Sequence, residues 1–384
     1  MAVKLPEGFV ASGISAGLKR SGKPDFGLIH SDGPLNWALL STTNLVHAAC
    51  VARNRFLLGG GDNVRAVVVN SGNANCATGE QGALDNDAMA AAVAAHLGLA
   101  GPDEVLTAST GVVGLRMPVD AILAGVRPLA EAGGDESDGF ARAILTTDLT
   151  LKQSAVDLPG GARVVGVAKG SGMIHPNMAT MLAFVMTDAQ VSQAELRQIW
   201  QDVAVATFNQ VTVDGDTSPN DMAMVLASNR VPADRDDLAA ALRQVADELA
   251  RMIARDGEGA TKLITVRVTG AFSDDEARLA ARTVAGSPLT KAAVHGSDPN
   301  WGRILVALGR SGAQFDPARC HIAVQDVPVY GGAPLPFDEA RTSALMESPD
   351  VLIGVDLKMG GGQGNAYGCD LTADYVRINA DYRT

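Results

Sequence analysis

The segment at residues 169–182, KGSGMIHPNMATML, has the residue types and spacing best suited to covalent chemistry. Thr180 follows a small residue, Ala179, in a loop where glycines free the backbone and Pro176 disfavours helix just before it. In such a turn the threonine hydroxyl can attack the preceding carbonyl, convert the peptide into an ester and let water cut the chain. The alternative is that Thr180 only caps a helix, and composition alone favours that alternative because loop threonines are common.

Cleavage at this point would create a second reactive group. The new N-terminal Thr180 would carry a free α-amine beside its own hydroxyl. Because such an amine titrates at about 7.7–8.0, it could act as the general base at neutral pH without a histidine. We therefore expect a scaffold role for His175, which precedes Pro176 in the same segment.

Strands and helices must position these residues, and the hydrophobic pattern predicts both kinds of element. Helical spacing recurs at 85–99, 119–132, 139–145, 193–208 and 235–255. Strand-like apolar runs occur at 65–70, 163–168, 263–269, 303–308, 321–329, 351–357 and 375–379. The mixture predicts an α/β or α+β fold of layered sheets and helices. Within it, residues 163–182 are expected to run as strand, loop and then helix.

Composition limits the classes of partner. The chain of 384 residues is 47% hydrophobic, which is enough to bury the cores of two or three domains. Its formal net charge of −12 repels phosphate backbones and anionic lipids. We therefore expect small-molecule partners, and neither nucleic acid nor a membrane.

The cysteines and the N-terminal residues bear on the cellular compartment. Four cysteines without a CxxC pair are too sparse for a disulfide framework or a zinc site, so no metal is expected. The N-terminal residues show no secretory or transit pattern. The longest near-apolar stretch, residues 89–101, is shorter than the ~20 residues that a membrane helix needs. These features predict a cytoplasmic protein.

The segment at 169–182 resembles the signature of the ornithine acetyltransferase family, the glutamate N-acetyltransferases of arginine biosynthesis. Five further blocks resemble the family in the same order along the chain. They are NSGNANCATGEQG (70–82), ASTGVVG (108–114), FNQVTVDGDTSPND (208–221), DGEGATK (256–262) and GSDPNWGR (296–303). The C-terminal INADYRT is also similar, so the resemblance covers essentially the whole chain. The one departure is Cys-Ala at 76–77, in place of Ala-Cys, and these two small residues should pack alike.

The resemblance implies a reaction. The chain would cleave itself between Ala179 and Thr180 into an alpha chain, 1–179, and a beta chain, 180–384, which would assemble as an α2β2 heterotetramer. Thr180 would accept the acetyl group of N2-acetylornithine, release ornithine, and pass the group to glutamate to give N-acetylglutamate. A covalent acetyl-threonine predicts ping-pong kinetics. No cofactor is implied. Some members use acetyl-CoA as the acetyl donor and others do not, and no motif decides between them.

The resemblance also implies the site residues. Thr110 and Gly111 match the pair that stabilises the oxyanion, although by itself such a pair is typical of a plain turn. The substrate-binding positions are Thr147, Lys169, Thr180, Glu258, Asn379 and Thr384, with Thr146 as the alternative to Thr147. Lys169 offers a cation for a substrate carboxylate or a like charge that lowers the pKa of the Thr180 amine. Glu258 offers an anion for the ornithine ammonium group, although a lone loop glutamate is typical of a solvated turn.

The fold implied by the family is an N-terminal-nucleophile-like αββα layered sandwich, of the ornithine acetyltransferase / L-aminopeptidase D-esterase type, with a smaller C-terminal α/β domain. Residues 1–230 are expected to form the sandwich that carries Thr180, and residues 231–384 the C-terminal domain with Glu258 and a docked tail. Two other functions stay open. An N-terminal-nucleophile aminopeptidase or amidase would hand the acyl group to water, and an amino-acid-binding protein would never be processed.

Overall fold

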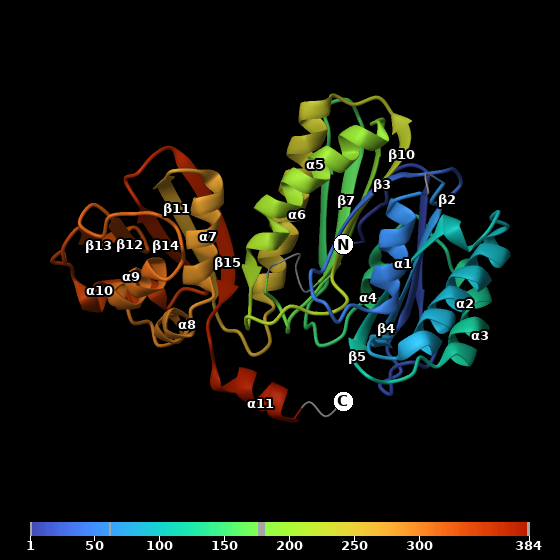
Figure 1. Ribbon diagram of the computed structural model, residues 1–384, viewed down its shortest axis with the longest axis horizontal. Helices are drawn as coiled ribbons and strands as arrows, with labels where there is room; N and C mark the ends of the chain where they lie inside the picture. The colour runs from blue at the N-terminus through green and yellow to red at the C-terminus, as the bar shows by residue number, and fades with distance from the viewer. Residues whose placement is uncertain (1, 61–62, 176–180, 382–384) are drawn as a thin grey trace.

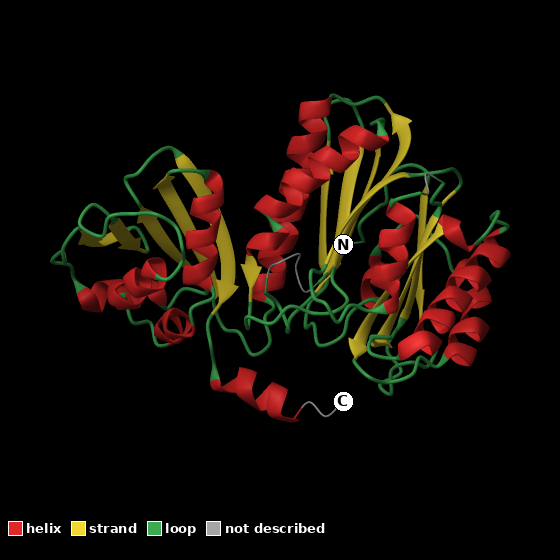
Figure 2. Ribbon diagram, viewed as in Figure 1, coloured by secondary structure: helices red, strands yellow, loops and turns green. Residues whose placement is uncertain are grey.

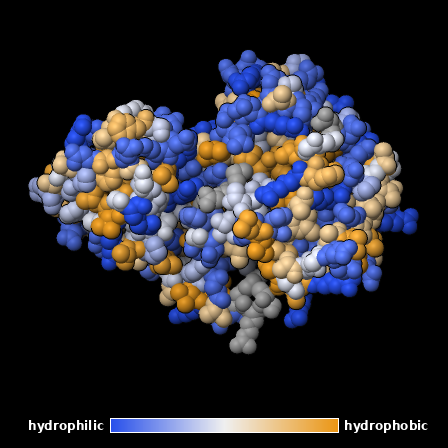
Figure 3. Space-filling model, viewed as in Figure 1, coloured by the Kyte–Doolittle hydropathy of each residue, from blue (hydrophilic) through white to orange (hydrophobic). Residues whose placement is uncertain are grey.

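The computed structural model describes residues 2–60, 63–175 and 181–381 (Figure 1). Within these ranges the strands form three sheets. Two sheets lie face to face in a larger layered unit, and the third belongs to a smaller C-terminal unit beside it (Figure 2). On the face shown in Figure 3, a notch separates the two units, and hydrophobic residues are interspersed with hydrophilic ones.

The first sheet has the strand order β1-β2-β4-β5. Its strands are β1 (Phe9–Ile14), β2 (Phe26–Ser31), β4 (Ala66–Asn73) and β5 (Val105–Val112). The associated helices are α1 (Ala49–Leu58), α2 (Gly79–Leu97), α3 (Val119–Glu131) and α4 (Asp138–Ala143). Helices α2 and α3 cover the outer face, because apolar residues of both pack against outward residues such as Leu28 and Val68.

The second sheet has the order β3-β10-β8-β7-β6. Its strands are β3 (Asn36–Ser41), β6 (Lys152–Asp157), β7 (Arg163–Lys169), β8 (Leu182–Ala189) and β10 (Met222–Val231). Helices α5 (Gln193–Ala206) and α6 (Arg235–Arg255) cover its outer face. Inner residues of the two sheets, such as Val67 and Phe184, share one core. The layers therefore run helix, sheet, sheet, helix, which confirms the expected αββα sandwich.

The third sheet has the order β13-β12-β14-β11-β15-β9. Its strands are β9 (Val211–Thr212), β11 (Leu263–Ala271), β12 (His321–Val324), β13 (Val327–Gly331), β14 (Asp350–Asp356) and β15 (Gly362–Cys369). The helices that follow α6 are α7 (Asp274–Ala285), α8 (Pro288–His295), α9 (Trp301–Gly309), α10 (Glu339–Met346) and α11 (Ala373–Asp381). Helices α7 and α9 share one core with this sheet, whereas α11 extends below both units (Figure 1).

The helices begin where the sequence provides caps. Ser192 and Glu195 form a capping box at α5, and Asp234 accepts from the first backbone N–H groups of α6. Helix α6 spans the predicted 235–255, and its apolar stripe packs on the second sheet. Its packing therefore lies with the larger unit, although the expected division placed it after residue 230. The division into 1–230 and 231–384 stays a prediction.

Three expected elements are wrong. Residues 303–308 belong to helix α9, because Asn300 accepts from Arg303 N and the apolar residues also fit helical spacing. Residues 375–379 belong to helix α11. The segment after Thr180 is strand β8 rather than a helix, since a continuously apolar run is compatible with either until its neighbours are known. The run at 321–329 is a hairpin, β12 and β13.

Three further features concern the described residues alone. The four cysteines are buried and free. No described helix has both the length and the apolar character needed to cross a membrane. Within the same ranges, no group of three or more histidine, cysteine or acidic side chains is placed to hold a metal ion.

Candidate active site

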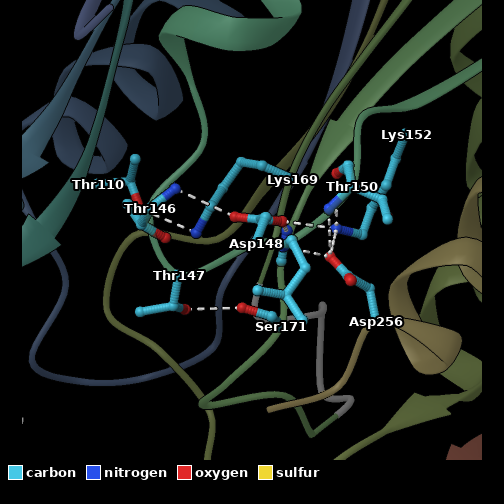
Figure 4. A network of polar contacts seen from close by, with 11 residues as sticks. Thr110, Thr146, Thr147, Asp148, Thr150, Lys152, Lys169, Ser171 and Asp256 are labelled. Carbon is cyan, nitrogen blue, oxygen red and sulfur yellow. Dashed lines mark hydrogen bonds and ion pairs between the residues drawn. The ribbon is translucent and has the colours of Figure 1, made fainter. Parts of the chain in front are cut away.

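The strand ends of the two face-to-face sheets bring the expected oxyanion threonine and the expected cation together. Thr110 lies near the end of β5, and Lys169 is the last residue of β7. Lys169 Nζ donates to Thr110 Oγ1 at 3.2 Å, and both residues are buried (Figure 4). In a buried position this polar pair interacts more strongly than it would in water.

Gly111 continues β5 in a conformation that requires glycine. Its φ of 132° is rare for residues with a side chain. A Cβ atom at this position would lie 2.4 Å from the backbone carbon of Gly72 on β4. The Thr110–Gly111 pair thus belongs to a strand end rather than to a plain turn, and no larger residue fits at position 111.

A buried cluster of charged side chains adjoins Lys169. Asp148 Oδ1 accepts from Gly170 N at 2.6 Å and from Lys152 Nζ at 2.7 Å (Figure 4). Lys152 Nζ also lies 2.5 Å from Asp256 Oδ2. The side chains of Asp148, Lys152 and Asp256 are 0%, 0% and 5% exposed. Buried charges of this kind are tolerated because they are paired and hydrogen-bonded.

Burial and charge compete at these groups. Burial lowers the pKa of Lys169, because the ammonium loses its hydration, and nearby Lys152 lowers it further against the opposing effect of Asp148. For Asp148, burial alone would raise the pKa, but Lys169 and Lys152 outweigh burial and lower the pKa to about 2. Asp148 is therefore ionised at neutral pH.

The low pKa of Asp148 predicts a loss of stability in acid. Because the folded pKa lies below the ordinary 3.8, the carboxylate stabilises the fold fully above about pH 4, and the effect is lost as the pH falls toward 2. The shift corresponds to about 2 kcal/mol. In urea unfolding between about pH 5 and pH 2, the Asp148→Asn variant should lose less free energy of unfolding than the wild type. Parallel curves would contradict this role of the carboxylate.

Ser171 joins two of the expected substrate loops. Its hydroxyl lies 2.7 Å from Thr147 Oγ1, and its carbonyl accepts from Glu258 N at 2.9 Å. At Gly172 a Cβ atom would lie 2.3 Å from Glu258 Oε2, so a larger residue there would displace the carboxylate from this position. Thr147 contributes a side-chain contact here, whereas Thr146 is held through its backbone N–H.

The C-terminal helix reaches the same loop. Asn379 on α11 donates through Nδ2 to Glu258 Oε2 at 3.0 Å. Tyr375, on the same helix, is partly buried against the core on the outer face of the second sheet. Burial raises the pKa of Tyr375, and the nearby Asp214 carboxylate raises it further. Residues that are far apart in the sequence therefore meet at Glu258.

Asp214 holds the chain that leads toward the proposed cleavage site. Its carboxylate accepts from Met173 N at 2.6 Å and from Ile174 N at 2.8 Å. His175 Nδ1 lies 3.1 Å from Thr212 Oγ1, and burial lowers the pKa of this histidine. Asp214 thus has a structural hydrogen-bonding role, and the contact of His175 fits the expected scaffold role.

Comparison with known proteins identifies the family. The model of the ArgJ family matches residues 10–384. The chain belongs to the ArgJ family. It is 55% identical to "Arginine biosynthesis bifunctional protein ArgJ" of Thermus thermophilus, over 100% of both chains. The Deinococcus radiodurans protein of the same name is 52% identical, over 100% of this chain and 98% of that one.

A solved structure agrees with the family assignment. The crystal structure of "Arginine biosynthesis bifunctional protein argJ" from Bacillus halodurans matches with a TM-score of 0.50 and 43% identity. The match covers 98% of that chain but 52% of this one. Membership of the ArgJ family confirms the resemblance inferred from the sequence blocks.

Three of the expected ArgJ site residues lie outside the described ranges. They are Ala179, Thr180 and Thr384. The described flanks of the segment that contains the proposed cleavage site are close together, because Lys169 at the end of β7 pairs with Leu182 at the start of β8. Met181 is buried, and its carbonyl accepts from Met222 N at 3.0 Å. The roles of the three residues stay predictions.

The described residues of the expected site are linked through consecutive residues of one ArgJ segment. Lys169 contacts Thr110, Gly170 contacts Asp148, and Ser171 contacts both Thr147 and the Glu258 loop. The motifs do not single out Asp148, Lys152, Asp256 and Ser171. Asp256 and Ser171 lie inside recognised blocks. Asp256 pairs with Lys152, 104 positions away, and Ser171 pairs with Thr147, 24 positions away, so neither contact leaves a local sequence signal.

Proposed function

We propose that this chain is an ornithine acetyltransferase that moves the acetyl group of N2-acetylornithine to glutamate through an acetyl-Thr180 intermediate. As a member of the ArgJ family it is an acyltransferase of arginine biosynthesis. The observation that carries the mechanism is the contact of Lys169 with Thr110. Lys169 also pairs with Leu182, so the segment that contains Thr180 leaves and returns to the sheet beside this contact. The polar substrates of this reaction are consistent with the expected cytoplasmic location.

The proposed chemistry proceeds in two displacements. The Thr180 hydroxyl attacks the acetyl carbonyl while the α-amine takes its proton, and the amine of ornithine leaves with a proton. The amine of glutamate then attacks the acetyl-threonine and restores the hydroxyl. The Thr110 hydroxyl and the Gly111 N–H stabilise the oxyanion in both steps. One amide is exchanged for another, so the reaction needs little driving force.

Charges around the site support the choice of substrates. Glu258 pairs with the side-chain ammonium of ornithine, and the Asn379 amide orients the carboxylate of Glu258. Lys169 faces the α-carboxylate that both amino acids share. Thr147 and Thr384 complete the proposed contacts. A cation at the end of β7 and an anion on the loop after α6 thus match an amino acid with a positively charged side chain.

The proposed maturation gives two chains that stay associated. Residues 180–384 would form a beta chain of 205 residues, about half of the precursor. The Bacillus halodurans chain supports this division, because it matches 52% of this chain while being covered almost completely itself. Assembly as an α2β2 heterotetramer is part of the proposal, and so is the use of acetyl-CoA as a second acetyl donor.

The identity of the molecule that accepts the acetyl group tests the proposed function. Adding glutamate to the enzyme and N2-acetylornithine should accelerate ornithine release and yield N-acetylglutamate, with parallel double-reciprocal plots. An aminopeptidase or amidase would release ornithine and acetate at a rate indifferent to glutamate. A binding protein would turn over neither substrate and would keep a single uncleaved chain. Either outcome would replace the acetyltransferase assignment.

Deleting residues 379–384 is expected to abolish acetyl transfer without unfolding the protein. Helix α11 has no buried residues, so truncation removes little core packing. It removes the Asn379 donor to Glu258, together with Thr384. Activity and thermal unfolding should be measured on the same preparation. A folded, fully active truncation would show that the tail takes no part in the site.

A further inference from the structure

Lys152 is a buried lysine that the proposed mechanism does not use. It is the first residue of β6, and its ammonium group lies 2.7 Å from Asp148 Oδ1 and 2.5 Å from Asp256 Oδ2. Figure 4 shows this ammonium group between the two carboxylates. A fully buried ion triad is a costly arrangement, and an apolar residue would fill the same volume at lower desolvation cost. The two partners of the lysine lead to different parts of the site.

The Asp148 arm leads to the reacting end of the site. Asp148 accepts from Gly170 N at 2.6 Å and, through Oδ2, from Thr146 N at 3.1 Å. Gly170 directly follows Lys169, whose ammonium group contacts the Thr110 hydroxyl. Moving Asp148 would therefore move the end of β7 and the proposed oxyanion threonine.

The Asp256 arm leads to the loop that recognises the substrate side chain. Asp256 Oδ2 also accepts from Leu149 N at 3.0 Å and Thr150 N at 3.3 Å. Asp256 lies two residues before Glu258, whose backbone N–H donates to the Ser171 carbonyl. Moving Asp256 would therefore move the carboxylate that is proposed to bind the ornithine ammonium group.

We propose that Lys152 is a positioning residue that fixes the distance between the acyl-transfer end of the site, through Asp148, and the side-chain recognition end, through Asp256. This inference rests on the proposed function. After cleavage at residue 179, Lys152 and Asp148 belong to one chain and Asp256 to the other. The same ion triad then holds the two chains together inside the site, which a surface contact could not do.

Two aspartate variants separate the two arms. In Asp256→Asn the amide oxygen can still accept from the backbone N–H groups, but the charge that holds Lys152 is lost. We expect KM for N2-acetylornithine to rise about tenfold and kcat to change by less than about twofold, because Glu258 is displaced. In Asp148→Asn we expect kcat to fall about tenfold with little change in KM, because Lys169 and Thr110 are displaced.

A matched control uses the ion pair between Arg255, the last residue of α6, and Asp350, the first residue of β14. Asp350→Asn removes the carboxylate partner of Arg255, which directly precedes Asp256, but that pair is partly exposed. The Asp350→Asn substitution should leave kcat and KM unchanged, since exposed ion pairs contribute little free energy. Lys152→Met should combine both effects, because it removes the shared cation. If Lys152→Met folds poorly, the two aspartate variants still decide the question.

The outcomes separate positioning from plain stability. A split in which Asp256→Asn changes KM and Asp148→Asn changes kcat supports the proposal. Kinetic losses that only follow the folded fraction in thermal unfolding would overturn it. If the wild type is active and both aspartate variants keep its kcat and KM, the positioning role is overturned and the proposed function stands. A wild type that transfers no acetyl group would overturn both.

Discussion

Replacing Thr180 with alanine is expected to leave a single polypeptide of 384 residues and to eliminate acetyl transfer. The wild type should instead give chains of residues 1–179 and 180–384 in intact-mass analysis. The alanine variant lacks the hydroxyl that starts the peptide-to-ester shift, and the same hydroxyl is the proposed acyl acceptor. Loss of a covalent nucleophile costs about 10⁴-fold or more in kcat. A single uncleaved chain in both proteins would refute self-processing.

Two controls separate failed cleavage from failed catalysis. Thr180→Ser keeps a hydroxyl and should still be cleaved and form an acyl intermediate. The two chains can also be produced from separate reading frames, with the second chain starting at Thr180 or at alanine. Only the threonine version should transfer acetyl groups. Transfer by the alanine version would place the nucleophile elsewhere.

Replacing Thr110 with alanine is expected to lower kcat by about 10²–10³-fold with a small effect on KM. Loss of one oxyanion donor costs about 3–4 kcal/mol in enzymes where this has been measured. The substitution also removes the acceptor of the Lys169 ammonium group, which lies at 3.2 Å. Steady-state kinetics with both amino-acid substrates provide the measurement.

The same strand offers a matched control. Thr107 on β5 is buried, and its hydroxyl has no hydrogen-bond partner among the described residues. Thr107→Val should therefore leave kcat unchanged, while Thr110→Ser should retain most activity. If Thr107→Val and Thr110→Ala lower kcat equally, the loss reflects strand packing rather than oxyanion stabilisation.

Local sequence patterns predict much of the layered architecture. Helix α6 spans the predicted residues because its apolar stripe and its Asp234 cap are both local signals. Strand β8 differs from the predicted helix because a segment buried on both faces has no periodic polar side. The run at 321–329 divides into two strands because Gln325 and Asp326 adopt positive φ in the hairpin turn.

The sequence by itself determined the family, and with it the reaction and most of the expected site residues, because reactive residues stand in short contiguous blocks. Tertiary structure alone decided how these blocks meet. Thr110, Lys169 and Glu258 come together only after two sheets stack and the loop that follows α6 returns to Ser171. In the buried triad, Lys152 pairs with Asp256, which lies 104 positions away in the sequence. Its stability depends on exclusion of water by the whole fold, and no local pattern records that exclusion.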